Sequence, residues 1–155
     1  MAAFRRAIRD LARRYDDIVV DIGSGEGAAI ESILRVADVA IVPVQPNGMD
    51  IWTMGLLDEL TVAALELNDG LKVRVILNRA SHHHASRDVQ SAMTALRACQ
   101  AIEVSDLVIR ERSSIRRAVP AGMLVNEYRP RDPKGSEEIA AVYRLVFAEE
   151  PPVHV

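Results

Sequence analysis

The sequence predicts an α/β fold of three layers, in which a mostly parallel sheet carries helices on both faces. Short apolar stretches typical of strands alternate along the chain with stretches of helical periodicity. Three glycines, Gly23, Gly25 and Gly27, follow the first apolar stretch, as at a turn from strand to helix in such sheets. The 155 residues, 49% of them hydrophobic, suffice for one core, so we expect a single domain over residues 1–155.

The first elements of the chain bring one carboxylate to the expected edge of the sheet. Phe4, Ile8 and Leu11 recur at helical spacing among five arginines, which indicates an amphipathic helix reaching to about Tyr15. Residues 17–21 then predict a strand that ends at Asp21. Ligands of parallel sheets bind at the carboxyl ends of strands, where a glycine turn lets N–H groups approach a phosphate or a water on Mg²⁺. Asp21 is therefore the first candidate site residue, and the alternative is an ordinary turn whose aspartate caps the next helix.

The remaining elements continue the alternation of strands and helices. After a helix at about 28–36 we expect strands at 39–44, 72–77 and 103–107, and helices at about 51–67, 86–99, 114–119 and 135–148. Apolar spacing predicts which side chains of the later helices face inward: Val89, Met93 and Leu96 in one, and Ile139, Val142, Tyr143 and Val146 in the last.

The glycine turn is similar to motifs of two families. Residues 21–27, Asp-Ile-Gly-Ser-Gly-Glu-Gly, resemble the first motif of S-adenosylmethionine-dependent methyltransferases. They also resemble the Walker B and switch II segment of the ParA/MinD ATPases, and the turn alone is compatible with both. A methyltransferase normally ends its next strand in an acidic residue that holds the ribose hydroxyls, whereas residues 38–46 end in prolines and a glutamine. This second segment resembles the ParA pattern of alanine-aspartate, apolar strand and proline-x-x-proline.

Later segments extend the resemblance to the ParA/MinD family. Residues 71–79 resemble its strand ending in asparagine or arginine, and residues 112–118 and 122–128 resemble its late arginine, alanine, glycine and tyrosine stretch. The resemblance runs from about Ile8 to Phe147 and is greatest to small plasmid-partition members such as ParF. It implies a P-loop NTPase-like fold in which the P-loop strand and the following unit are missing, since this sequence has no glycine-rich loop with lysines.

That gap has an expected structural consequence. In this family the P-loop strand lies between the Walker B strand and the strand that corresponds to residues 39–44. The strands at 17–21 and 39–44 should therefore lack a partner. We expect them to close against each other, to pair with another chain, or to leave a poorly stable product.

The resemblance also implies roles in nucleotide binding. Asp21 would be the catalytic residue and would hold Mg²⁺ through a water, while the backbone from Gly23 to Gly25 would sense the γ-phosphate of ATP. Pro43, with Pro46, would border the nucleotide and the dimer interface, and Asn78 would approach the adenine. Because the phosphate-binding lysines are missing, we expect no ATP hydrolysis by this chain alone.

Four arginines are candidates for nonspecific DNA binding. Arg110, Arg112, Arg116 and Arg117 fall within eight positions that contain one acidic residue, Glu111. In the ParA resemblance basic residues of this region neutralise DNA phosphates, and the alternative is a solvated helix face.

The intact form would be an ATP-dependent dimer in plasmid or chromosome segregation that works with a ParB-like centromere-binding partner. The other hypotheses are a methyltransferase and a noncatalytic module that forms a homodimer or a heterodimer with a ParA-like chain.

Other features point to simpler interpretations. His82, His83 and His84 are adjacent, so they rarely converge on one metal ion, and we interpret them as a solvated loop. Ser24 lacks the five-residue pattern of a hydrolase nucleophile.

The single cysteine, Cys99, fits a reducing compartment, and no apolar run approaches the roughly 20 residues of a membrane span. A net charge of −3 confines any DNA contact to a local patch, and we expect a cytoplasmic protein without membrane partners.

Overall fold

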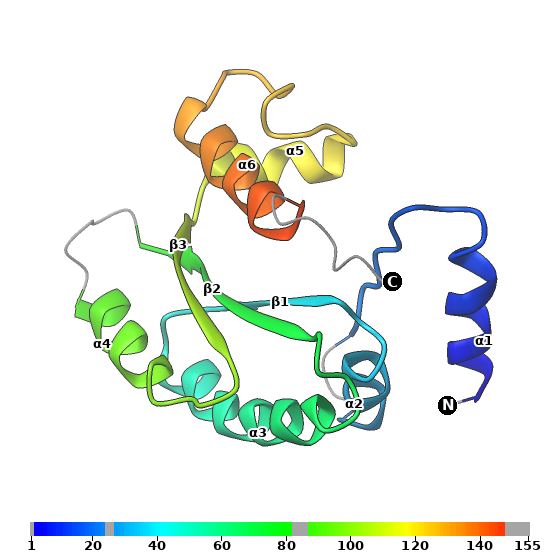
Figure 1. Cartoon of the computed structure of the whole chain (residues 1–155). Helices are drawn as coiled ribbons and strands as arrows, with labels where there is room; N and C mark the ends of the chain where they lie inside the picture. The colour runs from blue at the N-terminus through cyan, green and yellow to red at the C-terminus, as the bar shows by residue number, and fades with distance from the viewer. Residues whose placement is uncertain (1, 24–26, 82–86, 148–155) are drawn as a thin grey trace.

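The computed structural model describes residues 2–23, 27–81 and 87–147 and has an α/β architecture (Figure 1). Its strands are β1 (Val39–Val44), β2 (Lys72–Ala80) and β3 (Glu103–Arg110). Its helices are α1 (Ala2–Leu11), α2 (Gly27–Leu34), α3 (Gly48–Leu65), α4 (Arg87–Leu96), α5 (Ser113–Ala118), the short 3₁₀ helix η1 (Val119–Ala121) and α6 (Pro133–Phe147). The predicted order and type of elements is confirmed from α2 onward, with boundaries that differ by a few residues.

The three strands form one parallel sheet in the order β1-β2-β3. The first pair runs in unbroken register from Val39 opposite Lys72 to Val44 opposite Leu77. The second pair changes register twice between Val75 and Ala80, which marks irregularities in the ladder. Because all strands run the same way, their carboxyl ends meet at one edge of the sheet.

The main core lies between the sheet and helices α2, α3 and α4. Alternate residues of the central strand, Val73, Val75 and Leu77, are buried in one cluster with side chains from the three helices, among them Leu34, Met54, Ala64 and Leu96. Figure 1 shows these helices together below the sheet. This burial accounts for the apolar spacing of α4, where Leu96 is buried and Val89 and Met93 are half-buried as predicted.

The opposite face of the sheet is covered by α6. Arg74 alternates with the core residues of β2, and its Nη1 donates to the Leu145 carbonyl of α6 at 2.6 Å. Its Nε donates to Glu103 Oε2 on β3 at 2.9 Å. Helices therefore lie on both faces of the parallel sheet, as the sequence predicts.

The predicted strand at residues 17–21 is wrong. This segment has no regular secondary structure and belongs to no sheet, and Val19 is 86% exposed. In Figure 1 it descends from α1 to α2 on the right, whereas β1 ends on the left. A strand forms only where a neighbour accepts its backbone hydrogen bonds, and here β1 pairs with β2 alone among the described strands. The two segments thus do not close against each other.

Two helices differ from their predicted extent or orientation. The regular turns of α1 end at Leu11, and Tyr15 lies exposed in the following segment. On α6, Val142 and Val146 are half-buried as expected, but Ile139 and Tyr143 are exposed. The sheet beneath α6 is narrow, so a helix that packs mainly on β3 leaves part of its apolar side uncovered. None of the helices in the described ranges is long and apolar enough to cross a membrane.

Candidate functional site

The carboxyl edge of the sheet brings together several of the predicted site residues. Asn78 lies near the end of β2, Arg110 ends β3, and Pro43 lies on β1 opposite Ile76 in register. Ligands of parallel sheets bind at this edge because loops diverge there and leave backbone and side-chain groups accessible. The edge is therefore the candidate functional site of this chain.

The end of β2 is held in an unusual backbone conformation. Arg79 has a φ of 53°, in the left-handed region that residues other than glycine rarely adopt. The Asn78 side chain accepts a hydrogen bond from the Arg79 backbone N–H at 2.9 Å, which fixes the turn locally. Such a conformation costs on the order of 1 kcal/mol and is found preferentially at functional positions. The predicted base-binding residue thus stands beside a strained residue at the edge of the sheet.

Glu111 lies between two arginines at the same edge. Its Oε2 accepts a 2.6 Å hydrogen bond from Arg79 Nε, and its Oε1 lies 3.7 Å from Arg116 Nη1. The hydrogen bond and the charge of Glu111 raise the pKa of Arg79. Glu111 also donates its backbone N–H to the Ala80 carbonyl at 2.9 Å, which links the ends of β2 and β3.

Hydrogen bonds to side chains fix the turn between β1 and α3. Asn47 caps α3 by accepting from the Asp50 N–H at 2.9 Å, and Asp50 accepts from the Gln45 N–H at 3.1 Å. Pro43 is exposed, and its missing N–H is tolerated because β1 has one neighbour, β2, among the described strands. These contacts give β1 a defined exit into α3.

Asp21 and Gly23 do not join this edge. Both are exposed in the segment between α1 and α2, on the side of the molecule away from the end of β1 (Figure 1). A Cβ at Gly23 would meet no atom within 4 Å, so no close backbone approach explains that glycine. Gly25, Ser24 and the three histidines at 82–84 lie outside the described residues.

The residues expected to bind Mg²⁺ and ATP are not assembled into one site in the described part of the chain. The segment between α1 and α2, which carries Asp21, lies on the right in Figure 1, whereas β1 and β2 end on the left. No group of three or more metal-ligating side chains is found in the described ranges. The two lysines stand at the start of β2 and in the first turn of α6. Neither lysine follows a glycine-rich loop, which is where the lysines of a P-loop hold the phosphates.

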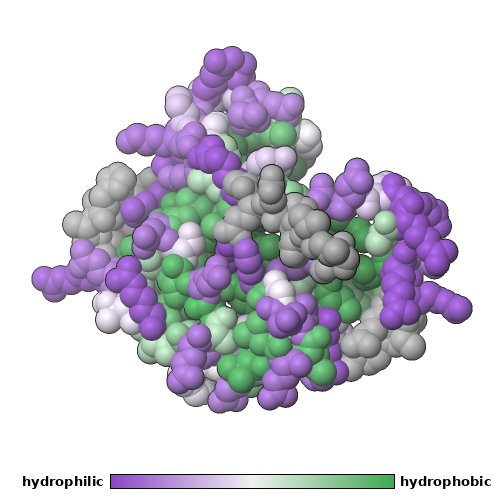
Figure 2. All heavy atoms as spheres, viewed as in Figure 1, coloured by the Kyte–Doolittle hydropathy of each residue, from purple (hydrophilic) through white to green (hydrophobic). Residues whose placement is uncertain are grey.

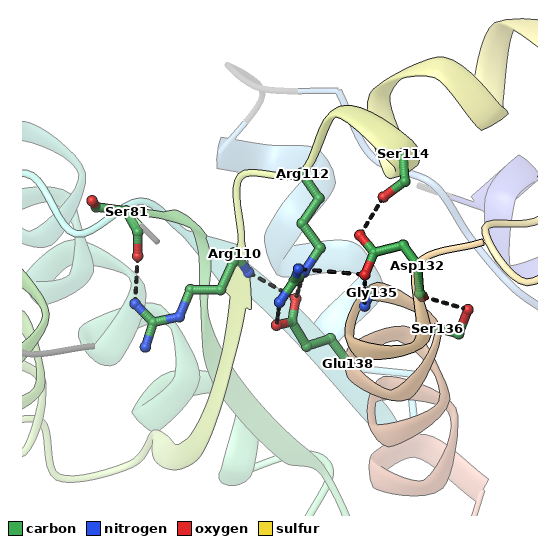
Figure 3. Close-up of polar contacts among 8 residues, drawn as sticks. All are labelled: Ser81, Arg110, Arg112, Ser114, Asp132, Gly135, Ser136 and Glu138. Atoms are coloured by element: carbon green, nitrogen blue, oxygen red, sulfur yellow. Dashed lines mark hydrogen bonds and ion pairs between the residues drawn. The ribbon is translucent and has the colours of Figure 1, made fainter. Parts of the chain in front are cut away.

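Arg112 is the centre of a polar network that fastens α6 to the end of β3 (Figure 3). Its Nε and Nη2 donate to the two carboxylate oxygens of Glu138 at 2.9 and 2.6 Å, and its Nη1 lies 3.4 Å from Asp132 Oδ1. The Arg110 backbone N–H also donates to Glu138, at 3.0 Å. Only 12% of the Arg112 side chain is exposed. A bidentate pair of this kind fixes both partners.

Asp132 joins the same network to α5 and to the start of α6. Its Oδ2 accepts from the Ser114 hydroxyl at 2.6 Å, and its Oδ1 accepts from the Gly135 N–H at 2.9 Å. The Ser114 hydrogen bond, followed by that from Gly135 and the charge of Arg112, lowers the pKa of Asp132. Sequence reasoning missed this residue, although an aspartate directly before a proline that begins a helix is a recognisable cap signal.

Glu138 is held ionised against the effect of burial. Burial would raise its pKa, but hydrogen bonds from Arg112 and from the Arg110 N–H, together with the charges of both arginines, lower it. In return, the Glu138 hydrogen bond raises the pKa of Arg112. The network is therefore a charged clamp between β3, α5 and α6.

The four candidate DNA-binding arginines have different surroundings. Arg112 is occupied by Glu138 and Asp132, and Arg110 points away from them and donates to the Ser81 carbonyl (Figure 3). Arg116 and Arg117 lie exposed in the last turn of α5. Their position leaves Arg116 and Arg117 as the most accessible of the four.

Gly135→Ala should destabilise the protein by about 1–2 kcal/mol, because overpacking is costly where neighbours cannot move. An added Cβ would lie 3.0 Å from both Arg112 Cδ and Asp132 Oδ2, which the clamp holds in place. Gly55→Ala, in α3 where a Cβ meets nothing within 4 Å, should instead stabilise by up to about 1 kcal/mol. Urea unfolding of both variants checks this, and equal stabilisation by the two alanines would contradict the clamp.

No protein-family model matches this chain, and no curated protein matches it in sequence.

Proposed function

We propose that this chain is a ParA/MinD-type domain of plasmid or chromosome segregation whose own activity is nonspecific DNA binding through α5. The observation that carries the proposal is the shared edge of the parallel sheet. Motifs that resemble the family run along β1, along β2 and through the segment after β3, and the carboxyl ends of these three strands meet at that edge. The proposed role rests on DNA and protein contacts rather than on ATP hydrolysis, because this sequence has no glycine-rich loop with phosphate-binding lysines.

The local charge of α5 supports the DNA contact. Arg116 and Arg117 are adjacent and exposed on a helix that the Ser114–Asp132 hydrogen bond anchors to the start of α6. Adjacent arginines on an anchored helix can reach neighbouring phosphates without reading the base sequence. Binding of this kind is electrostatic and weakens steeply as salt displaces the protein.

Replacing Arg116 and Arg117 by alanine together should reduce the slope of log affinity against log salt by about 2, at roughly 0.9 per lost phosphate contact. Affinity for a random-sequence duplex at low salt should fall about tenfold. Fluorescence anisotropy titrations of a labelled duplex at several salt concentrations measure both quantities.

The matched control is the pair Arg87→Ala and Arg97→Ala, two exposed arginines at the ends of α4, on the opposite face of the sheet from α6. It should leave the salt slope unchanged. Failure of the wild-type chain to bind DNA, or equal weakening by both pairs, would overturn the proposal. Saturable binding of S-adenosylmethionine would favour the methyltransferase, and altered ATPase of a full-length ParA on mixing would favour the interaction module.

A further inference from the structure

Helix α1 and the segment that follows it form an arm, residues 2–23, with little packing on the rest of the chain. No other described element packs extensively on α1, and Figure 1 shows it standing at the right of the molecule. A helix of ten residues is marginal in water unless its apolar side is covered. Phe4 and Ile8 are half-buried, whereas Leu11 and, in the following segment, Val19 are exposed. We therefore look for a surface outside the arm's own surroundings on which its apolar residues can pack.

The arm is also basic. Arg6 and Arg9 are exposed on α1, Arg13 and Arg14 follow it, and Asp10 is the one acidic residue within the helix. Phe4, Ile8 and Leu11 occupy the side of the helix between these charges. A surface that covers α1 should thus combine an apolar stripe with negative charge.

Helix α3 carries such a surface on its outer side. Met49, Trp52 and Leu56 follow one another at helical spacing and are 82%, 85% and 64% exposed. Glu59 continues the same line and is exposed. A helix that is apolar on both sides is normally covered on both sides, and only the inner side of α3, with Met54 and Ala64, is buried in the core.

The charge of α3 is opposite to that of the arm. Gly48–Leu65 contains three acidic residues and no basic one. Asp50 and Asp58 are half-buried and accept backbone N–H groups of neighbouring segments of the same chain. Glu59 is therefore the acidic side chain that continues the exposed line of Met49, Trp52 and Leu56. Figure 2 shows the hydrophilic side of α1 on the right and apolar surface below the sheet, where α3 lies.

We propose that two copies of this chain associate by exchanging their arms, so that α1 of each copy packs along Met49, Trp52 and Leu56 of the other. A second copy is the occupant because its arm offers apolar residues and four exposed arginines to the apolar stripe and Glu59, whereas the chain's own α1 stands on the other side of the molecule from the start of α3 (Figure 1). Reciprocal exchange of one element makes a closed two-fold dimer in which both stripes are covered. The association requires neither nucleotide nor DNA and does not depend on the proposed function.

Trp52 is the only tryptophan of the chain, which makes it a direct probe of this contact. The full chain should sediment as a dimer at tens of micromolar and dissociate on dilution. As the chain is diluted through the concentrations at which the dimer dissociates, the emission of Trp52 should shift to longer wavelength, because its ring becomes exposed to water. High salt should weaken the dimer by screening the opposite charges.

Charge reversal tests the two surfaces against each other. Arg6→Glu with Arg9→Glu makes the arm acidic, and Glu59→Lys makes the stripe basic. Each variant alone should therefore raise the dimer dissociation constant at least about tenfold, because like charges meet. An equimolar mixture of the two variants should restore the dimer, because each arm then meets a complementary stripe. The matched control, Arg87→Glu with Arg129→Glu, changes two exposed arginines outside the arm and should remain dimeric.

Three results would overturn the proposal. They are a monomeric wild-type chain with concentration-independent Trp52 emission, a dimer that neither charge variant weakens, and a mixture that fails to restore association. Binding of the wild-type chain to anionic phospholipid vesicles, lost in the arm variant and without change at Trp52, would assign α1 to a membrane surface instead. Far-ultraviolet circular dichroism establishes that each variant is folded, and dilution of the wild-type chain tests the contact without any substitution.

Discussion

Arg112→Ala should lower the free energy of unfolding by about 3 kcal/mol, the cost of leaving partly buried carboxylates without their cation. Glu138 would lose two hydrogen bonds from the guanidinium, and Asp132 would lose its charged neighbour. The side chains of all three residues are less than a quarter exposed, so water replaces the lost contacts only in part. Such a loss is a large fraction of the stability of a small domain.

Urea unfolding followed by circular dichroism measures this change. Arg97→Ala removes an exposed arginine whose partner, Asp106, lies 3.4 Å away at the surface, and this control should cost less than about 0.5 kcal/mol. A double-mutant cycle with Glu138→Ala should return a coupling of at least about 1 kcal/mol. Equal effects of Arg112→Ala and Arg97→Ala would show that the clamp does not hold α6.

The same variant should change how stability depends on pH. The pKa values of Asp132 and Glu138 are lowered in the folded protein, so the unfolded chain binds more protons just below its own carboxyl pKa values of about 4. The stabilisation is therefore complete above these values and is lost as the pH falls through the folded pKa values. Wild-type protein should lose more stability than Arg112→Ala between about pH 5 and pH 3, and parallel pH profiles would contradict this assignment.

Leu77→Ala should destabilise the protein by about 2–5 kcal/mol, the range for truncation of a fully buried leucine. Leu77 is 1% exposed, and it lies on the central strand in the cluster that joins the sheet to α2, α3 and α4. Truncation would open a cavity in the main core of a sheet with only three described strands.

The control for this cavity is Leu67→Ala. Leu67 lies just after α3 and is largely exposed, so its truncation should cost less than about 0.5 kcal/mol. Chemical denaturation of both variants separates burial from the removal of a leucine in general. A loss below about 1 kcal/mol for Leu77→Ala would mean that this face of the sheet is not a packed core in solution.

Much of the fold could be predicted from local pattern. The strand at 39–44 has the predicted bounds, and the strands that begin at Lys72 and Glu103 start where apolar periodicity places them and extend a few residues further. Local pattern succeeds there because each strand packs on neighbours that the sequence also specifies. It fails at residues 17–21, whose apolar composition equals that of a strand while no described neighbour pairs with it.

The candidate site, like the fold, was predictable from the sequence only in part. Sequence placed Asn78 and the arginines after the ends of strands, and the parallel sheet brings Asn78 and Arg110 to one edge. It could not distinguish Arg112 from Arg116, since both are arginines of the same short motif. The carboxylates that occupy Arg112 come from residues 20 and 26 positions away, a separation that no local pattern encodes.

By itself, the sequence determined the parallel α/β class, the succession of helices and strands from residue 27 onward, and the concentration of positive charge after β3. These follow from period and composition, which act between near neighbours. Only the tertiary structure decided that Asp21 lies outside the sheet, that Arg112 is a clamp, and that the outer side of α3 is uncovered. The reason is physical: ladder pairing, ion pairing and burial depend on which distant segments meet, and that depends on the packing of the whole chain.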